Sequence, residues 1–337
     1  MANCHKLFTD FIDALAITDT KRSSMMTSRE NLREHIRTAF EKDHPDYKIK
    51  FYIQGSYKME TTIRTKDDEC DLDDGVYISP KPDVKCSTLQ QWVYDSVKGI
   101  TSAAPIKKNK CIRVKYQSGY HIDLPIYVKE DLTDSDETPQ LAIKNGNYEE
   151  SDPKAVVDWF RNAKKDNPQL VRIVKYLKAW CDNTHGSMPP GLAMTILAVN
   201  NQKENERDDI ALKDTLKAIK AQLDSEFKCV VPAAPNDDMF ADYSEDKKKY
   251  IMSALETFIS DANKALNEPN EKKASKIWIK YLGNRFPEGE DKENKTLTKL
   301  NELKDSILSK TARVSSSGIL GNISTGVAAA THTNFGD

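Results

Sequence analysis

The order of secondary-structure patterns in the first 130 residues restricts the fold more than any other feature of the chain. Apolar residues recur at helical spacing in two stretches up to residue 43, and Pro45 follows the second. From about residue 47 the spacing alternates as in a strand, in "YKIKFYI" and then "DLDDGVYIS". One helical pattern, "STLQQWVYDSVKGI", precedes two more strand patterns, "KCIRVKY" and "YHIDLPIYV". This order predicts an α+β fold with helices on a mixed sheet, and not a regular βαβ alternation.

The remainder of the chain is mainly helical in pattern. Residues 129–153 are polar and irregular, so we expect a loop and a lobe boundary there. Helical spacing then recurs from "PKAVVDWFRNAKK" to "KASKIWIKYLGNRF". The segment from about residue 313 is rich in Ser, Gly, Ala and Thr without sustained periodicity. We therefore expect a core with N-terminal helices over residues 1–150, a helical lobe over 151–312 and a flexible tail over 313–337.

Charge and cysteine content restrict the class of partner and the compartment. The net charge is −2, from 50 basic and 52 acidic residues, whereas proteins that coat DNA or RNA usually carry a basic excess. The six cysteines form no CxxC pair and no zinc-like spacing, so they indicate free thiols in a reducing compartment. The N-terminus lacks a signal-peptide layout, and the longest apolar-rich run, "GLAMTILAV", is too short for a bilayer. We expect a cytoplasmic protein without a membrane or long nucleic-acid partner.

Two aspartates on one strand face are the first candidate metal ligands. On an extended strand Asp71 and Asp73 point to the same side, with Leu72 opposite. Two adjacent carboxylates repel each other unless a cation neutralises them, and Mg²⁺ prefers such oxygen ligands together with phosphates and water. Asp123 alternates with Ile122 and Leu124 in a later strand pattern and therefore faces away from the core. If the two strands are neighbours, three carboxylates converge.

The competing interpretation is that "KDDECDLDD" is a solvated acidic loop. A D-x-D pair is common by chance, and metal-dependent sugar transferases use such pairs too. The combination of a Gly-Ser turn after a strand, a D-x-D about fifteen residues later and a strand-borne aspartate is more specific. Within this stretch we predict that residues 67–69 form a solvated connector. Asp74 is predicted to face away from the pair and to help end the strand at Gly75.

The turn at Gly55 and Ser56 is the candidate phosphate site. Gly55 allows close backbone approach, and Ser56 supplies a hydroxyl and an amide proton at an expected helix start. Backbone N–H groups at a helix start attract phosphate oxygens. The alternative is that Ser56 is a plain helix cap.

Together these stretches resemble the polymerase-β-like nucleotidyltransferases, and among them the bacterial cGAS/DncV-like nucleotidyltransferases. The resemblance rests on "QGSYKM", "DLDDGVY" and "HIDLPIY" in that order, and extends to "SDPKAVVDWF", "VRIVKYLKAW" and "PNDDMF". It covers most of residues 1–310. It implies a nucleotidyltransferase core with a mixed sheet and a mainly helical C-terminal lobe that closes over nucleotides.

The resemblance implies roles for the motif residues. Gly55 and Ser56 would cradle a triphosphate, and Asp71, Asp73 and Asp123 would bind two Mg²⁺ ions, with Mn²⁺ as a substitute. Asp123 would also assist removal of the proton from the attacking hydroxyl. The family pattern gives Asp74 no metal-binding role.

Further nucleotide contacts are expected from the same resemblance. They are Gln54 and Tyr57 beside the turn, Arg113 before Asp123, Ser151 in "SDPKAVVDWF", Lys178 in preference to Lys175, and Asp237 or Asp238 toward a guanine edge. Three alternatives remain open: Lys178 as a surface lysine of an amphipathic helix, Ser151 as an N-cap, and the two acids as an exposed turn. A phosphate contact from Ser187 stays open as well.

The function implied by the resemblance is synthesis of a cyclic dinucleotide from GTP, ATP or both, in anti-phage signalling. Guanine is weakly favoured, and a downstream effector would be reached only through the product. A monomer is expected. A linear oligonucleotide synthase, an RNA terminal transferase and a non-catalytic nucleotide sensor are the alternatives.

Overall fold

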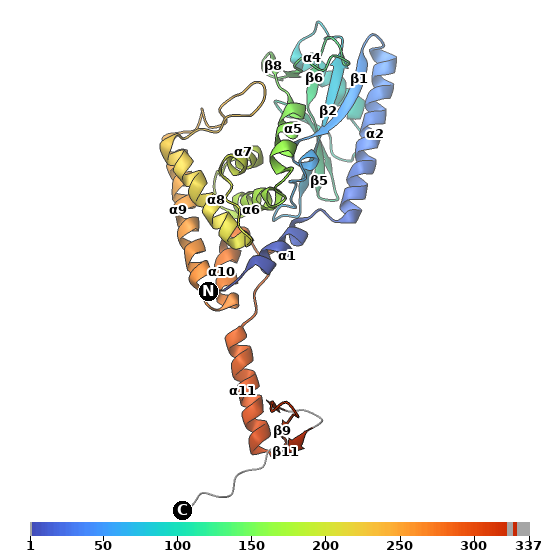
Figure 1. Cartoon of the computed structure of the whole chain (residues 1–337). Coiled ribbons are helices and arrows are strands. Elements are labelled where there is room, and N and C mark those ends of the chain that lie inside the picture. Colours follow the sequence, from blue (N-terminus) through green and yellow to red (C-terminus); the bar gives the residue numbers. More distant parts are fainter. Residues whose placement is uncertain (1, 322–325, 329–337) are drawn as a thin grey trace, which may run out of the picture.

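The computed structural model describes residues 2–321 and 326–328, without the side chains of residues 292–295. Figure 1 shows a sheet with its helices, a second group of helices beside it, and a C-terminal helix that projects from the rest. The α+β fold with a mixed sheet and a mainly helical second lobe is as predicted.

The sheet has eight strands, and β2 lies at its centre. Antiparallel pairing joins β1 to β2, while β5 and β6 pair with β2 in parallel. The hairpin β3–β4 extends the sheet beyond β5, and β7–β8 extends it beyond β6. The strands are β1 (Lys48–Gln54), β2 (Cys70–Ser79), β3 (Ile106–Lys107), β4 (Ile112–Tyr116), β5 (Tyr120–Leu124), β6 (Ile126–Val128), β7 (Gln140–Ala142) and β8 (Tyr148–Glu150).

One face of the sheet is covered by α2 (Asp19–Asp43) and α4 (Cys86–Val97). Alternate residues of β2, including Leu72, Val76 and Ile78, are fully buried against these helices. Thr18 is the N-cap that precedes α2, and its side chain accepts a hydrogen bond from the Lys21 amide. The other face of the sheet is therefore left to the second lobe.

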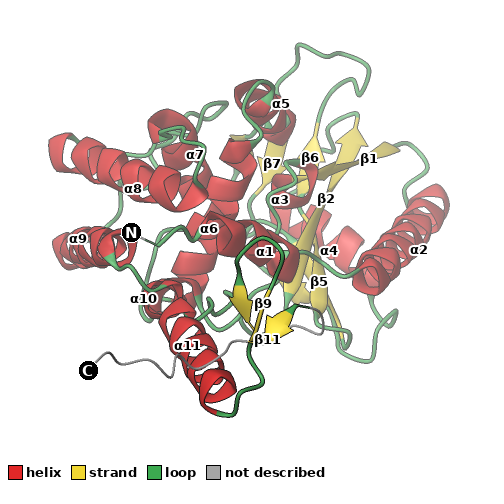
Figure 2. Ribbon diagram, turned by 60° about the horizontal axis from the view of Figure 1, so that its bottom comes forward, coloured by secondary structure: helices red, strands yellow, loops and turns green. Residues whose placement is uncertain are grey.

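The second lobe packs around aromatic side chains of its own. Its helices are α5 (Pro153–Lys164), α6 (Gln169–Asn183), α7 (Gly191–Asn201), α8 (Asp208–Ser225), α9 (Glu245–Asn267) and α10 (Glu271–Leu282). Figure 2 shows α6 to α10 on one side of the strands and α2 on the opposite side. Phe8 and Phe11 of α1 (His5–Leu15) are fully buried in this helical core with Trp278. The first helix thus packs with the second lobe, although it was grouped with the sheet from the sequence.

Three local predictions were wrong. Residues 140–142 and 148–150 form β7 and β8, because β7 pairs with β6 and β8 pairs with β7. The strand β2 continues through Gly75 to Ser79, since β1 pairs with it along that whole stretch. The helix α10 ends at Leu282, where Gly283 adopts a φ of 87° in place of continuing to Phe286.

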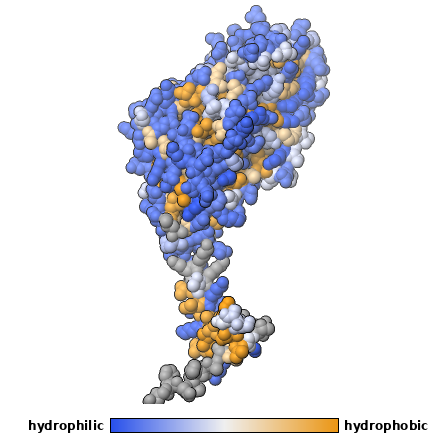
Figure 3. All heavy atoms as spheres, viewed as in Figure 1, coloured by the Kyte–Doolittle hydropathy of each residue, from blue (hydrophilic) through white to orange (hydrophobic). Residues whose placement is uncertain are grey.

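The C-terminal segment contains α11 (Lys292–Leu308) and the short strands β9 (Arg313–Val314), β10 (Leu320–Gly321) and β11 (Val327–Ala328). Figure 3 shows apolar side chains gathered on this projecting segment, and Leu308 and Val327 are among its exposed residues. The expected flexible tail falls partly on residues 322–325 and 329–337, which lie outside the described residues. Across the helices of the described chain, none is both long and apolar enough to cross a membrane.

Candidate active site

A row of four polar side chains crosses the face of the sheet that looks toward the helical lobe. Strand pairing places Gln54 opposite Asp73, Asp73 beside Asp123, and Asp123 opposite Arg113. Paired residues on neighbouring strands project to the same face, and the strands lie about 4.8 Å apart. The register therefore brings Asp123 next to Asp73, as the alternation of apolar residues predicted.

Within this row, Asp73 has a pKa far from the ordinary value of an aspartate. Burial, together with the nearby Asp71 and Asp123 carboxylates, raises its pKa to about 8, although Arg113 and Lys178 act in the opposite direction. His121 pairs with Asp71 in the next row of the sheet. Burial, followed by the Arg113 charge, lowers the pKa of His121. Arg113 and Lys178 therefore do not fully offset the effect of burial and of the neighbouring carboxylates on the pKa of Asp73.

The third aspartate has a cationic partner already. Arg113 Nε donates to Asp123 Oδ1 at 2.8 Å, and Nη2 donates to Oδ2 at 2.7 Å. This two-pronged contact raises the pKa of Arg113 and keeps the guanidinium over the carboxylate. Arg113 therefore lies where the resemblance expected it, but it holds Asp123 and does not line the cavity described below.

The Gly-Ser turn fits closely around Asp73. Gly55 begins the short helix α3 (Gly55–Lys58) with a φ of 62°, and a Cβ at this position would lie 2.1 Å from Asp73 Oδ2. Only glycine tolerates both the left-handed backbone and this approach. Ser56 Oγ lies 2.9 Å from Thr62 Oγ1, so its hydroxyl is fixed within the turn. The first N–H groups of α3 have no partner within the helix.

Gly75 makes room for the amide of Gln54. Gln54 Nε2 donates to the Tyr127 hydroxyl at 2.9 Å, and its Oε1 is buried without a partner in the described structure. A Cβ at residue 75 would come within 2.6 Å of that Oε1. The glycine after the aspartates therefore packs Gln54 rather than ending the strand.

Lys178 reaches the sheet from α6 of the helical lobe. Its Nζ donates to Thr61 O at 3.1 Å and to Thr61 Oγ1 at 3.0 Å. Burial lowers its pKa to about 8, while Asp71 and Asp73 act in the opposite direction. The alternative of a surface lysine is therefore wrong, because the amine faces the paired carboxylates.

A cavity of about 1070 Å³ lies between the sheet and the helical lobe. Of the predicted residues, it is lined by Gln54, Gly55, Ser56, Asp71, Asp73, Ser151, Lys178, Asp237 and Asp238, and also by Ser187. Asp123 and Arg113 belong to the same row of the sheet but are not among the residues that line this cavity. Tyr57 lies elsewhere: its hydroxyl donates to the Met26 sulfur at 3.9 Å and its ring packs against the core under α2.

The structure distinguishes the roles expected of Asp237, Asp238 and Ser151. Asp238 Oδ1 accepts from the amides of Cys229 and Phe240 at 2.8 and 3.0 Å, so this oxygen is committed to the loop. Asp237 is exposed at the cavity. The N-cap of α5 is Asp152 and not Ser151, since the Asp152 side chain accepts from the Ala155 amide.

The expected solvated connector is partly held in place. Asp68 Oδ2 accepts from Lys21 at 3.0 Å, and its Oδ1 accepts from Arg64 and Arg285 at 3.1 and 3.3 Å. These cations lower the pKa of Asp68. The connector therefore ties α2 to the helical lobe, which the sequence did not reveal because the three cations lie far apart along the chain.

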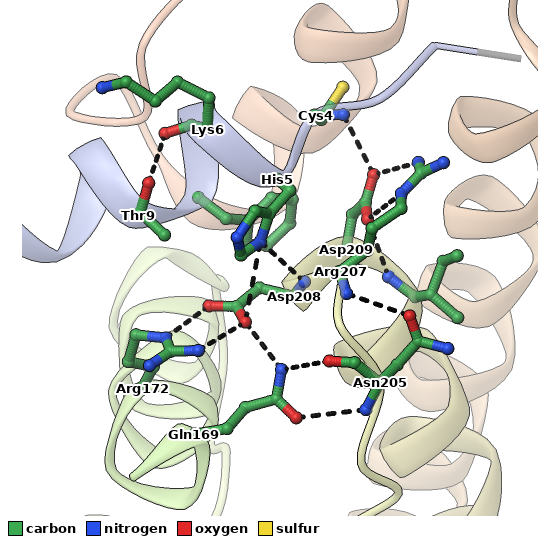
Figure 4. A network of polar contacts seen from close by, with 12 residues as sticks. Cys4, His5, Lys6, Thr9, Gln169, Arg172, Asn205, Arg207, Asp208 and Asp209 are labelled. Carbon is green, nitrogen blue, oxygen red and sulfur yellow. Dashed lines mark hydrogen bonds and ion pairs between the residues drawn. The ribbon is translucent and has the colours of Figure 1, made fainter.

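The helix that carries Lys178 is anchored by a buried polar network (Figure 4). Asp208 accepts from Arg172 Nε at 2.6 Å, from Gln169 Nε2 at 2.7 Å and from the Tyr176 hydroxyl at 2.8 Å. The Tyr176 hydroxyl also hydrogen-bonds to Phe8 O at 2.9 Å. This network joins α1, α6 and α8, so that α6 has one fixed orientation toward the sheet.

The residues present fit a divalent cation at the paired carboxylates. Asp71 and Asp73 share one strand face, and the raised pKa of Asp73 reflects a charge that a cation would neutralise. Within the described residues, no three His, Cys, Asp or Glu side chains are grouped as a ready metal site. This agrees with the position of Asp123, whose two carboxylate oxygens accept from Arg113.

Several site residues were not identified from the sequence. Thr61 and Thr62 fix the Lys178 amine and the Ser56 hydroxyl, and His121 faces the same side as Asp71. The alternation of "YHIDL" places residues 121 and 123 on one face, which was the available signal for His121. No such signal was available for the threonines, because the partner of Thr61 is distant in the chain and the partner of Thr62 is Ser56 in the preceding turn.

A mixed sheet that presents paired aspartates beside a Gly-Ser turn, with a helical lobe across the cavity, defines the α+β nucleotidyltransferase class of fold. Residues 49–127 match the family model for the nucleotidyltransferase domain of proteins like the cyclic GMP-AMP synthase DncV. Residues 167–295 match the model for the C-terminal domain of cyclic GMP-AMP synthase. The two matches together span more than half of the chain, which belongs to the cGAS/DncV-like nucleotidyltransferase family.

Curated relatives carry two different product names. A cyclic GMP-AMP synthase from Escherichia albertii is 31% identical over 213 residues, or 58% of this chain and 46% of that protein. One from Vibrio cholerae is 26% identical and is matched over 72% of this chain and 68% of its own. A cyclic AMP-AMP-AMP synthase from Acinetobacter is 24% identical over 83% of this chain and 84% of its own. The chain thus spans about half the length of the Escherichia albertii relative.

Solved structures agree on the fold. The crystal structure of Vibrio cholerae DncV cyclic AMP-GMP synthase has a TM-score of 0.75 at 21% identity and covers 85% of this chain and 97% of its own. The same enzyme in complex with the linear intermediate pppA(3′,5′)pG has a TM-score of 0.73 at 21% identity, with 85% and 96% covered. At this identity the likeness establishes the fold.

Proposed function

We propose that this protein is a Mg²⁺-dependent nucleotidyltransferase that makes a cyclic dinucleotide from nucleoside triphosphates. The observation that carries the proposal is the row Gln54–Asp73–Asp123–Arg113, with Gly55 packed on Asp73 at the floor of the cavity. Relatives named as cyclic GMP-AMP and cyclic AMP-AMP-AMP synthases support the same reaction class.

Asp71 and Asp73, with Asp123 beside them, are the residues that would hold the divalent cations. When bound, such cations neutralise phosphate charge and align the attacking and leaving oxygens. Mg²⁺ is the expected ion and Mn²⁺ a substitute, because both accept carboxylate and phosphate oxygens.

The chain itself supplies the binding and orientation of the triphosphate. The first N–H groups of α3 follow the Gly-Ser turn, and N–H groups at a helix start would suit phosphate oxygens. With a pKa of about 8, the Lys178 amine is mainly protonated at neutral pH and offers positive charge from the opposite lobe. A ribose hydroxyl would attack the α-phosphorus, form the new P–O bond and release pyrophosphate, with Asp123 assisting removal of the hydroxyl proton. A second round in the same cavity would close the ring.

The size and lining of the cavity support two nucleotides. Single small-molecule sites usually measure roughly 300–1,000 Å³, and this cavity measures about 1070 Å³. We assign the base-contacting carboxylate to Asp237, because Asp238 is held by backbone amides. A carboxylate suits the N1–H and N2–H donors of guanine, so a guanine-containing product is favoured.

The alternatives are a linear oligonucleotide synthase, a terminal transferase acting on RNA, and a non-catalytic nucleotide sensor. The near-neutral charge of −2 favours small nucleotides over a polymer substrate. The presence of all three aspartates favours an enzyme over a sensor. Anti-phage signalling through an effector that binds only the product, a monomeric state and a cytoplasmic location stay predictions.

The test is incubation of the protein with all four triphosphates and Mg²⁺, followed by mass spectrometry of products that resist phosphatase. A cyclic product with pyrophosphate release is expected, and the Asp71→Asn/Asp73→Asn variant should form none. A phosphatase-sensitive linear product would replace the cyclic assignment. Nucleotide binding without pyrophosphate under any condition would favour the sensor.

A further inference from the structure

Asp74 occupies the face of β2 opposite the paired aspartates. Its side chain is 0% exposed, and its neighbours on this face, Leu72 and Val76, are equally buried. Arg33 of α2 donates from Nε to Asp74 Oδ2 at 2.7 Å and from Nη2 to Oδ1 at 2.6 Å. The Arg33 guanidinium also lies 5.3 Å from the centre of the Phe51 ring on β1. One ion pair therefore fastens α2 to the central strand immediately behind Asp73.

Stability alone does not explain a charge pair at this place. Removing two charges from water costs several kcal/mol per ion, and well-packed apolar residues of similar volume often stabilise a protein as well or better. The rest of this face is apolar, so leucine and methionine would suit it. The pair must therefore contribute something that an apolar contact cannot.

The ion pair holds one of two consecutive aspartates on the core side of β2. Asp73 and Asp74 are consecutive, and consecutive strand residues face opposite sides of a sheet. A shift by one residue would turn Asp73 into the core and Asp74 toward the cavity. In the observed register Arg33 makes a bidentate contact with Asp74 on the core side, and Asp73 projects to the cavity side.

We propose that Arg33 and Asp74 are positioning residues that fix β2 so that the Asp71 and Asp73 carboxylates stay together on the cavity side. The proposal rests on the proposed function, in that these carboxylates are the cation ligands. The pair acts through the backbone of β2 and touches neither cation nor nucleotide. Its loss is expected to loosen the carboxylate pair and weaken cation binding more than it weakens the fold.

The probe is Mn²⁺ alone, titrated into the full chain without nucleotide and followed by electron paramagnetic resonance of the free ion. Arg33→Met/Asp74→Leu removes both charges and leaves neither unpaired. Its unfolding midpoint in denaturant should stay close to that of the unmodified protein, while its Kd for Mn²⁺ rises about tenfold. Unchanged Mn²⁺ affinity in this folded variant would overturn the proposal.

Two single substitutions complete the set. Arg33→Lys keeps the charge but loses the two-pronged contact, so the Kd should rise about threefold. If the double variant does not fold, Arg33→Lys decides the matter, and an unchanged Kd overturns the proposal. Arg37→Met is the matched control, because Arg37 lies on the same helix and 5.1 Å from the same Phe51 ring but pairs with Glu34. A loss in this control equal to that of the double variant would also count against the pair.

Steady-state turnover provides a second test of the positioning role. For the double variant, kcat should fall about tenfold while KM for the triphosphates stays within about twofold, since the phosphate-binding groups are untouched. If the unmodified protein binds Mn²⁺ through Asp71 and Asp73 but forms no product, the proposed function fails and the positioning role stands on the affinities. If product forms and the variants bind Mn²⁺ normally, only the positioning role fails. Absence of Mn²⁺ binding in the unmodified protein would overturn both.

Discussion

Two groups of buried aspartates in this protein differ in how far their charges are neutralised. In the helical lobe Asp208 accepts hydrogen bonds from Arg172, Gln169 and Tyr176, and these contacts hold its pKa below the usual range despite burial. On the sheet, burial and neighbouring carboxylates raise the pKa of Asp73 to about 8. The first carboxylate has its partners within the protein, whereas the second is the one that we propose to bind a cation. Burial of an acid therefore does not by itself separate a structural role from a functional one; the set of partners does.

The largest effect is expected from removing the satisfied carboxylate. Asp208→Ala leaves Arg172, Gln169 and Tyr176 without their acceptor, so the free energy of unfolding should fall by about 3 kcal/mol or more. Denaturant titration measures this. Asp10→Ala, which removes an exposed ion pair with Lys6, is the control and should stay within about 0.5 kcal/mol. An equal loss of unfolding free energy in the two variants would contradict the structural role of Asp208.

The opposite result is expected on the sheet. Asp73→Asn removes a repelled carboxylate, so the free energy of unfolding at pH 7 should stay constant or rise. Product formation should nevertheless fall by at least about 100-fold, because the variant loses a proposed cation ligand. Stability and turnover are measured on the same preparation. A strongly destabilised Asp73→Asn variant would show that Asp73 is satisfied within the protein after all.

A smaller change tests how closely the phosphate turn packs on that carboxylate. Gly55→Ala places a Cβ 2.1 Å from Asp73 Oδ2 and should reduce turnover by up to about 100-fold through displacement of Asp73. Gly99 has a φ of 87° with nothing within 4 Å of the corresponding Cβ. Gly99→Ala therefore carries the backbone strain alone, and its turnover should remain normal. Similar turnover in the two variants would contradict the close-packing argument.

The smallest effect is in the pH dependence of stability. Between about pH 4 and 8 the folded state keeps a proton on Asp73 that the unfolded state releases, so this group lowers stability as pH rises. Lys178, whose pKa is lowered to about 8, raises stability with pH from there up to its unfolded value of 10.5. Asp208 acts below its unfolded pKa of 3.8, where stability is lost as pH falls.

Denaturant titrations from pH 5 to 8 isolate the first of these slopes. The unmodified protein should show a decline that Asp73→Asn lacks, and saturating Mg²⁺ should remove the same decline. A decline that persists in Asp73→Asn belongs to another group, and this group is not His121, because the lowered pKa of His121 makes stability rise with pH.

The sequence predicted the parts of the site that follow from local periodicity. Alternation placed Asp71 and Asp73 on one face and Asp123 on the same side of its own strand, and strand pairing confirms that Asp73 and Asp123 are neighbours. Their metal-binding role stays a proposal. The Gly-Ser turn at a helix start was also predictable from composition.

Long-range partners were not predictable. Arg33, which holds Asp74, precedes it by 41 residues, and Arg285, which reaches Asp68, follows it by 217. Strands β7 and β8 were missed because their pairing, not their polar sequence, defines them. The first helix was grouped with the sheet because chain proximity says nothing about which core receives Phe8 and Phe11.

That placement of α1 affects how the two lobes can move. The chain begins in the helical lobe, enters the sheet lobe through the short link between Leu15 and Asp19, and returns near Asp152. Two covalent crossings fix two points shared by both bodies. If the lobes close over a nucleotide as proposed, these two links would favour rotation about the line that joins them. Cutting or lengthening the link at residues 16–18 would remove one of the two constraints and would allow the lobes to rotate about further axes.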